Sequence, residues 1–439
     1  MKPRRQPAGR HTRRALRTLA WLALGCSLLG GCGRAGHDDD GTLTFWAFGR
    51  EGEAMQQLLP EFERAHPQIH VRLQQLPLTA AHQKLLTAYA GNSTPDLCQL
   101  GNTWLPELVA LHALAPLQSR VDASAVVRPA DYFASIWATN VIDGTLYGVP
   151  WYVDTRLLFY RTDLLKKAGF DAPPATWAQW RTMLAALSDP ARHRYGILLP
   201  TNEYEQLMSL ALQQPDPLLR DGGRYGNFQS AGFKRALSFY VDTFRLRQAP
   251  AITNVEAGNP WEEFGRGVYA FYLSGPWNIG EFRARLPAAE QADWSTAPLP
   301  GPDGAGVGAA GGSSLVIFRA SRHKAAAWAL IEYLSQPRVQ QRFYDLLGDM
   351  PPRRSSWQAA ALRDDPKAQA FREQLEHVRP TPAVPEWERI ANDMQLQAAR
   401  AVAGELTIDQ AAAEMDRQAD RILEKRRWIL AHAAPQAAR

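Results

Sequence analysis

The chain has 439 residues, a formal net charge of +5 and three cysteines. That length exceeds what one ordinary hydrophobic core accommodates, so at least two lobes are expected. The charge does not indicate a nucleic-acid partner, because seven of the lysines and arginines lie within Met1–Arg17, which has no acidic residue. The rest of the chain carries a formal charge of about −2 (5 − 7), and it has no basic stripe that would bind a phosphate backbone.

The first 31 residues are expected to be a lipoprotein signal peptide. Their basic start leads into the apolar run LAWLALGCSLLGG, which is too short for a permanent membrane span. The run ends in LLGGC, which resembles the lipobox of bacterial lipoproteins, and Cys32 is therefore the predicted lipidation site. An ordinary cleaved signal is the alternative. Residues 32–41 are polar and glycine-rich and are expected to form a tether to the membrane.

After residue 41, strand-like and helix-like segments alternate. TLTFWAF (42–48) alternates like a strand, and EAMQQLLPEFERAHP then has helical periodicity up to Pro67. IHVRLQQL is a second strand, AHQKLLTAYAG is a helix that ends at Gly91, and PDLCQLG is a third strand. Strands and helices at this spacing predict an α/β fold whose sheets are mainly parallel and flanked by helices.

The stretch YGVPWYVDTRLLFYR (147–161) combines strand periodicity with an acid and a base. Read as one strand, Trp151 and Val153 lie on one face and Tyr152, Asp154 and Arg156 on the other. We expect this alternation to break between Trp151 and Arg156, so that one strand enters a hinge and another leaves it.

Most catalytic signatures are absent from the sequence. It contains no G-x-S-x-G elbow, H-E-x-x-H, P-loop or Cys-x-x-Cys motif, and its histidines lack ligand spacing. No metal, cofactor or enzymatic activity is expected. Glu262 and Glu263 leave a polysaccharide-cleaving enzyme open as an alternative.

Aromatic residues lie beside polar ones where strands meet loops, and 14 tryptophans are present. A sugar offers an apolar face that packs on an aromatic ring and a rim of hydroxyls that need polar partners. Packing of the same rings in the core is the alternative. The pairs that show the pattern are Trp46 with Arg50 and Glu51, Trp104 with Asn102, Trp151 with Asp154, and Trp277 with Asn278.

Six segments in order resemble the bacterial extracellular solute-binding proteins of the family that includes the maltose-binding proteins. The segments are FWAFGREGEAMQQLLPEFERAHPQIHVRLQQLP, AHQKLLTAYAGNSTPDLCQLGNTWLPEL, YGVPWYVDTRLLFYRTDLLKKAGF, YLSGPWNIGEF, GGSSLVIF and GELTIDQAAAEMDRQADRIL. The resemblance implies a type II periplasmic-binding-protein fold, a two-lobe clamp with a three-crossing hinge that closes on a sugar. It also implies delivery to an inner-membrane ABC permease, with its cytoplasmic ATPase, by a monomer that is lipid-anchored in the periplasm or cell envelope.

The three crossings are expected near Trp151–Arg156, Ser313–Val316 and Asp349–Arg353. They divide the chain into a signal peptide (1–31), a tether (32–41), two parts of an N-terminal lobe (42–150 and 315–350) and two parts of a C-terminal lobe (151–314 and 351–439).

The resemblance also implies a set of ligand-binding residues. Trp277, Tyr204 and Trp387 match stacking aromatics, and we expect Trp277 and Trp387 to face the cleft between the lobes. Asn102, Glu51 or Arg50, and Arg353 match polar contacts. The remaining predicted ligand-binding residues are Trp46, Trp104, Tyr152, Asp154, Arg156, Asn278, Gly312 and Ser313. The alternatives are structural: Asn102 as a helix cap, Gly312 as a hinge residue, and Asp154 with Arg156 as an ion pair.

Two or more rings with several polar groups favour a neutral di- or oligosaccharide, with maltose or trehalose first. A glycerol phosphate would need a cationic pocket, for which only Arg50, Arg156 and Arg353 are available.

Overall fold

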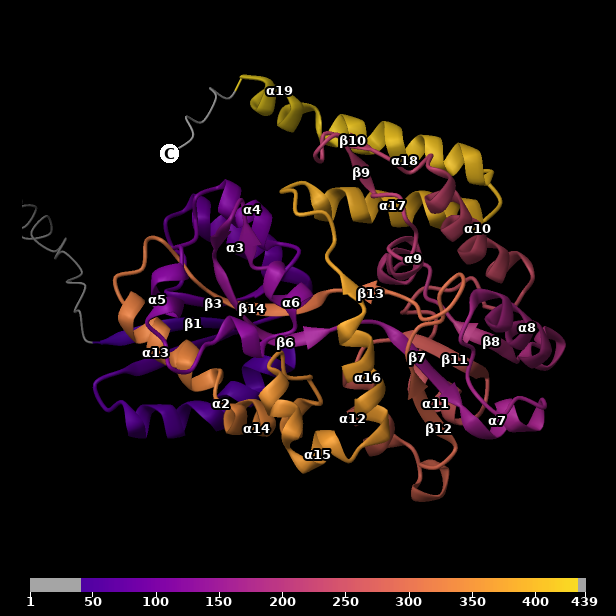
Figure 1. Ribbon diagram of the computed structural model, residues 1–439, viewed down its shortest axis with the longest axis horizontal. Helices are drawn as coiled ribbons and strands as arrows, with labels where there is room; N and C mark the ends of the chain where they lie inside the picture. Colours follow the sequence, from indigo (N-terminus) through magenta and orange to yellow (C-terminus); the bar gives the residue numbers. More distant parts are fainter. Residues whose placement is uncertain (1–40, 433–439) are drawn as a thin grey trace, which may run out of the picture. The chain divides into compact units, whose positions relative to one another are not determined.

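The computed structural model describes residues 41–432, and the chain from Leu43 onward forms one compact unit. The predicted signal peptide, Cys32 and all but the last residue of the tether lie outside the described residues. No helix within 41–432 has the length and apolar character needed to cross a membrane. Two larger sheets flanked by helices, together with three two-stranded sheets, make up the described part of the unit (Figure 1), which confirms the predicted α/β class.

The first sheet has five strands and the second has four. The order in the first is β2 (His70–Leu76), β1 (Thr42–Phe48), β3 (Leu97–Gly101), β14 (Gly311–Ile317) and β6 (Gly148–Asp154). The order in the second is β12 (Trp294–Ala297), β7 (Leu157–Arg161), β11 (Tyr269–Ser274) and β8 (Tyr195–Leu198).

Helices cover both faces of each sheet, because the strands direct apolar side chains to both faces. On β1, Phe45 packs against α2 (Gly49–Ala65), α13 (Lys324–Leu334) and α14 (Pro337–Leu347). Trp46 packs on the other face against α3 (Leu78–Ala90) and α4 (Leu105–Ala110).

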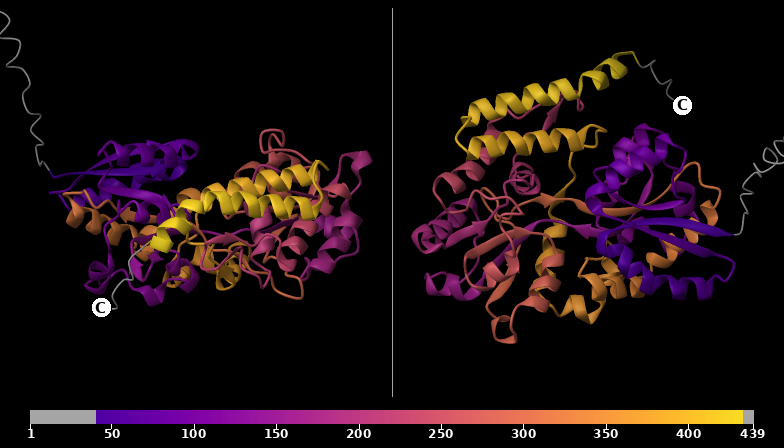
Figure 2. Two further views of the ribbon diagram at one scale, coloured as in Figure 1. Left: turned by 90° about the horizontal axis from the view of Figure 1, so that it is seen from above. Right: turned by 180° about the vertical axis from the view of Figure 1, so that it is seen from behind.

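The second sheet is covered in the same way. Leu158 belongs to a core that also contains residues of α8 (Trp177–Leu187), α9 (Glu205–Ala211), α10 (Ala231–Arg245), α17 (Trp387–Val402) and α18 (Ile408–Ile422). Phe159 faces α11 (Pro260–Gly265), α12 (Trp277–Arg285) and α16 (Pro366–Glu376). The two long helices α17 and α18 lie side by side, as both views in Figure 2 show.

Short elements complete the described chain. They are α5 (Gln118–Asp122), η1 (Pro129–Asp131), α6 (Ala134–Ala138), β4 (Val141–Ile142), β5 (Thr145–Leu146), α7 (Thr162–Lys167), η2 (Pro190–Arg192), β9 (Leu219–Arg220), β10 (Tyr225–Gly226), η3 (Ala288–Glu290), β13 (Gly308–Ala309), η4 (Arg354–Gln358), α15 (Ala360–Arg363), β15 (Val378–Arg379) and α19 (Glu424–His432).

One detail of the predicted sheets needs correction, because both are mixed rather than mainly parallel. β1 pairs with β3 in parallel and β11 with β8 in parallel, but β14 and β7 run antiparallel to both of their neighbours. The reason lies in the connections between the sheets. The chain leaves the first sheet through β6 and returns to it through β14, so these two adjacent strands must run in opposite directions.

The stretch 147–161 is two strands in two sheets. β6 ends at Asp154, Thr155 and Arg156 belong to no strand, and β7 begins at Leu157 in the second sheet. The alternation therefore breaks at Thr155–Arg156. The return strand β14 includes Ser313–Val316, and beyond α14 the Val153 amide donates to the Met350 carbonyl at 2.9 Å.

Gly312 occupies the most constrained backbone position where β14 meets β6. Its φ is +129°, and a Cβ atom there would lie 2.3 Å from the Tyr152 carbonyl oxygen. A side chain at this position would both strain the backbone and push the strands apart. We expect Gly312→Ala to lower the free energy of unfolding by about 3 kcal/mol in urea titrations. Gly304→Ala is the matched control, because no atom lies within 4 Å of its Cβ position, and an equal loss in both variants would contradict the argument.

Candidate functional site

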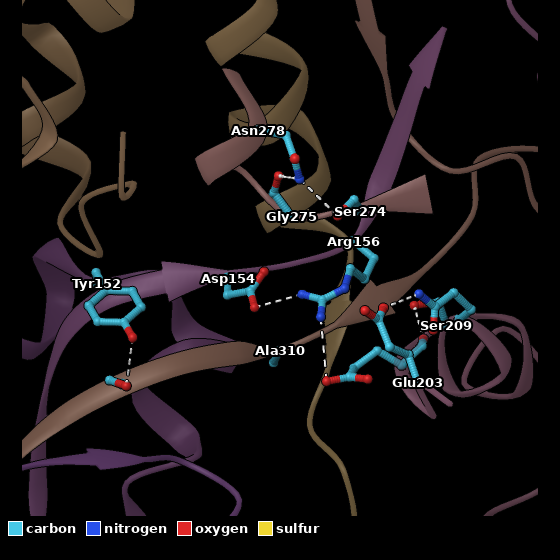
Figure 3. Close-up of polar contacts among 12 residues, drawn as sticks. Tyr152, Asp154, Arg156, Glu203, Ser209, Ser274, Gly275, Asn278 and Ala310 are labelled. Carbon is cyan, nitrogen blue, oxygen red and sulfur yellow. Dashed lines mark hydrogen bonds and ion pairs between the residues drawn. The ribbon is translucent and has the colours of Figure 1, made fainter. Parts of the chain in front are cut away.

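Several predicted binding residues meet where β6 passes into β7. The end of β6 supplies Tyr152 and Asp154, the link to β7 supplies Arg156, and β14 contributes Ser313 beside Tyr152. Glu51 comes from the first turn of α2 and Trp277 from the start of α12. The site is therefore assembled from elements of both sheets (Figure 3).

Tyr152 is the centre of a hydrogen-bond network on the side of the first sheet. Its hydroxyl donates to Glu51 Oε1 at 2.7 Å and lies 3.0 Å from Ser313 Oγ and 3.2 Å from Gln99 Nε2. Gln99 Oε1 also accepts from the Phe48 amide at 2.7 Å, which fixes the turn that carries Glu51 into the site. Burial raises the pKa of Glu51 above its usual value, and burial followed by the charges of Glu51 and Asp349 raises the pKa of Tyr152.

Arg156 is held among two carboxylates and an indole ring. Its guanidinium lies 2.7 Å from Asp154 Oδ2 and 3.4 Å from Glu205 Oε1, and its centre is 4.9 Å from the centroid of the Trp277 ring. Burial alone would lower the pKa of Arg156, but Asp154 and Glu205 raise it above its usual value. Figure 3 shows the guanidinium directed at Asp154. Asp154, at the end of β6, and Arg156, just after it, therefore form an ion pair with each other. Asp154 Oδ1 is left without a hydrogen-bond partner among the described residues.

Trp277 lies where the helices and strands of the first sheet approach those of the second sheet. It begins α12 after the Gly275–Pro276 break and is half-buried. One turn later, Glu281 forms an ion pair of 2.9 Å with Arg50 of α2. This ion pair places Arg50 at the edge of the site and links α2, beside the first sheet, to α12, beside the second sheet.

Four other predicted binding residues are buried. Trp387 is 0% exposed among apolar residues beside α10 and α18, and Trp46 is 8% exposed on β1. The Asn278 amide is buried and bonded to Trp261, Ser274 and Gly275. Arg353 is buried, 2.7 Å from Asp131, and also donates to the Ser335 carbonyl. The polar groups of Asn278 and Arg353 are thus already paired within the protein.

Of the four remaining predicted residues, Gly312 lies at the junction of β14 and β6, and the other three have partly exposed side chains. Asn102 Nδ2 donates to the Ala310 carbonyl at 2.8 Å, and its backbone amide donates to the Gly312 carbonyl, so it ties the β3 loop to β14. Trp104 is half-buried, with its ring centroid 4.9 Å from that of His82. The Tyr204 hydroxyl, just before α9, donates to Glu388 at 3.5 Å.

Sequence reasoning missed four residues of this region. Glu205 pairs with Arg156 and Glu281 pairs with Arg50, but each acid lies far from its arginine along the chain, so no local pattern links them. Gln99 carried a usable signal, since it is a polar residue in the buried strand LCQLG. Asp349 also carried one, because it directly precedes the MPPR segment of the third predicted crossing.

Metal and thiol chemistry find no support in the described part of the chain. Residues 41–432 contain no group of three or more His, Cys, Asp or Glu side chains that could hold a metal ion. Cys98 is a free, fully buried thiol, and burial raises its pKa well above the usual value, which makes it unreactive.

Comparison with known proteins agrees with this architecture. Residues 48–341 match the family model of the bacterial extracellular solute-binding proteins. A solved structure, the sugar-binding protein MalE from Xanthomonas citri, is 54% identical and superposes with a TM-score of 0.86. The match covers 90% of this chain and 100% of that protein. Two curated relatives are the diacetylchitobiose-binding protein DasA of Streptomyces coelicolor and the mannitol-binding protein of Pseudomonas aeruginosa.

DasA is 24% identical over 81% of this chain and 86% of its own length. The mannitol-binding protein is 26% identical over 84% of this chain and 90% of its own length. The structural neighbour and both relatives are thus matched over nearly their whole length, and the family model covers well over half of the sequence. The chain belongs to the family of bacterial extracellular solute-binding proteins.

Proposed function

We propose that this protein is the sugar-binding component of an ABC importer and captures a neutral di- or oligosaccharide between the two sheets. The observation that carries the proposal is a partly exposed tryptophan, Trp277, beside a network of hydroxyl-compatible groups on Glu51, Tyr152 and Ser313. The ring provides a stacking surface and the network provides partners for sugar hydroxyls. Maltose and trehalose are the first ligands to test, and the similarity to a sugar-binding MalE supports the class.

The charges at the site favour a neutral ligand over a phosphorylated one. Each arginine that could bind a phosphate already has an acidic partner: Arg50 has Glu281, Arg156 has Asp154 and Glu205, and Arg353 has Asp131. A phosphate would have to displace a carboxylate and would meet the remaining acids. Hydroxyl groups can donate to these carboxylates without such a cost.

The proposed mechanism is capture by closure. The strands β6 and β14 and the segment after α14 form three connections between the sheets, and we propose that they act as a hinge with lobe boundaries near 150, 314 and 350. A ligand that contacts both lobes favours the closed state by its difference in affinity for the two states. The closed form would then be recognised by an ABC permease with its ATPase, and lipidation at Cys32 would keep the protein at the membrane in the cell envelope.

A thermal-shift screen tests the ligand class. The panel contains maltose, trehalose, diacetylchitobiose, mannitol and glycerol 3-phosphate. We expect a concentration-dependent rise in melting temperature with at least one of the oligosaccharides and none with the phosphate, because a ligand that binds only the folded state stabilises it. Chromatography of each sugar after incubation tests the enzymatic alternative, for which cleaved product is the expected result. A shift with none of the sugars contradicts the proposed class.

Replacing Trp277 by alanine is expected to weaken binding of the sugar found in the screen by about 10- to 100-fold, since a stacking ring and its buried area are lost. Isothermal titration calorimetry measures the change. Trp428→Ala is the matched control, because the Trp428 ring on α19 is 63% exposed and far along the chain from the site. Equal affinities of the Trp277 variant and the wild-type protein would remove this ring from the site.

A further inference from the structure

Asp349 lies in the middle of the site, although the sequence marks it only as the start of the third predicted crossing and not as a binding residue. Val153 on β6 forms an antiparallel bridge with Met350, and this register places Asp349 directly opposite Asp154. On its other side, the Cβ position of Gly348 lies 3.9 Å from Trp277 Cα. The Asp349 residue is therefore enclosed between the β6–β7 connection and the start of α12.

The carboxyl of Asp349 has no compensating partner. It is 9% exposed, and no described residue donates a hydrogen bond to it or forms an ion pair with it. The charged groups that act on it are Glu51, Asp154 and, with opposite sign, Arg50. Arg50 is engaged by Glu281 and Asp154 by Arg156, so an ionised Asp349 would face Glu51 and the paired Asp154 in a buried position with no cation of its own. Burying an unpaired charge beside like charges is strongly unfavourable, so a proton is taken up instead.

The hydrogen bonds decide which carboxyl of the neighbouring pair carries the proton. Glu51 accepts from the Tyr152 hydroxyl at 2.7 Å and from Gln99 Nε2 at 3.4 Å, and both bonds stabilise its ionised form. Asp349 receives neither. Burial, and then the charges of Glu51 and Asp154, raise the pKa of Asp349 well above its usual value of 3.8. The proton therefore resides on Asp349, and Glu51 remains the hydrogen-bond acceptor.

We propose that Asp349 is a specificity-determining, ligand-contacting residue that binds the sugar as a neutral carboxylic acid, with its proton directed to a sugar oxygen. This inference rests on the proposed function and extends it, because it assigns a donor to a site whose other carboxylates only accept. A sugar oxygen in this position satisfies a buried group that has no partner in the protein, whereas an anionic ligand would meet Glu51 and Asp154.

The protonation of Asp349 is tested without any ligand. Asp349→Asn imitates the neutral acid, and Asp303→Asn, at an exposed position, is the matched control. A raised pKa means that the wild-type protein loses stability as the pH rises above 3.8. We therefore expect Asp349→Asn to raise the melting temperature by roughly 2 °C or more at pH 8 and by less at pH 5, with no change in the control. A gain that does not grow with pH overturns the assignment.

The contact with ligand is tested by calorimetry with maltose and trehalose. We expect Asp349→Asn to retain wild-type affinity at pH 6 to within about threefold and Asp349→Ala to bind at least about tenfold more weakly. Wild-type affinity should fall as the pH rises through the raised pKa of Asp349, whereas that of Asp349→Asn should not. If Asp349→Asn binds as poorly as Asp349→Ala, Asp349 does not bind the sugar as a neutral acid. If Asp349→Ala binds normally, Asp349 does not contact the sugar. A wild-type protein that binds neither sugar contradicts the proposed ligands, while the ligand-free measurement still decides the protonation.

Discussion

Replacing Arg156 by alanine is expected to lower the free energy of unfolding by about 3–5 kcal/mol at pH 7, the largest effect of any polar substitution at the site. The side chain of Arg156 is only 10% exposed and neutralises Asp154 and Glu205. Without it, two mostly buried carboxylates would remain close to each other with no cation between them. Urea unfolding followed by circular dichroism measures the change.

The pH dependence of the Arg156→Ala variant follows from the same geometry. Burial already raises the pKa of Glu205, and the positive charge of Arg156 opposes that rise, so its removal raises the pKa further. A carboxyl whose pKa is raised in the folded state lowers the free energy of unfolding at high pH, and this loss is recovered as the pH falls through that pKa. The deficit of Arg156→Ala should therefore shrink at acidic pH, and a deficit that is independent of pH would contradict the charge argument. Arg363→Ala is the control, because its pair with Asp364 is exposed and its loss should leave stability unchanged.

Replacing Trp387 by alanine is expected to lower the free energy of unfolding by about 3–5 kcal/mol and to leave the sugar affinity of the folded protein unchanged. The ring is completely buried at the start of α17, in the core between that helix and the second sheet, so its removal leaves a large cavity. Thermal or urea unfolding measures the first effect and calorimetry with the identified sugar measures the second.

Trp428→Ala is again the matched control, since its ring is mostly exposed on α19. The comparison separates core packing from ligand stacking: Trp277→Ala should affect affinity more than stability, and Trp387→Ala should do the reverse. Weakened sugar binding by a folded Trp387→Ala protein would indicate that Trp387 contributes to the binding site.

Much of the fold was predictable because it depends on local patterns. The strand TLTFWAF coincides with β1, and the helix and strand that follow it were placed within a few residues of α2 and β2. The expected break in the stretch 147–161 is present at Thr155–Arg156, because a strand that crosses between two cores must leave its ladder of hydrogen bonds. The direction of β14 and β7 was not predictable, since strand direction depends on which sheet each strand joins.

The site was only partly predictable. Glu51, Tyr152, Asp154, Arg156, Trp277 and Ser313 meet as a group. Their contacts join residues that are far apart along the chain, such as Tyr152 and Ser313, which are separated by 161 positions. Sequence spacing alone did not reveal that Glu205 neutralises Arg156, or that Asp349 faces Asp154.

The sequence by itself determined the order of strands and helices, the position of the first crossing, and the aromatic and acidic character of the residues around it. The tertiary structure decided which of two similar tryptophans is available to a ligand. Trp277 and Trp387 each begin a helix beside polar residues, yet Trp277 on α12 stays partly exposed at the junction and Trp387 on α17 is completely buried. Periodicity reports which face of an element is apolar, but burial depends on what other parts of the chain pack against that face.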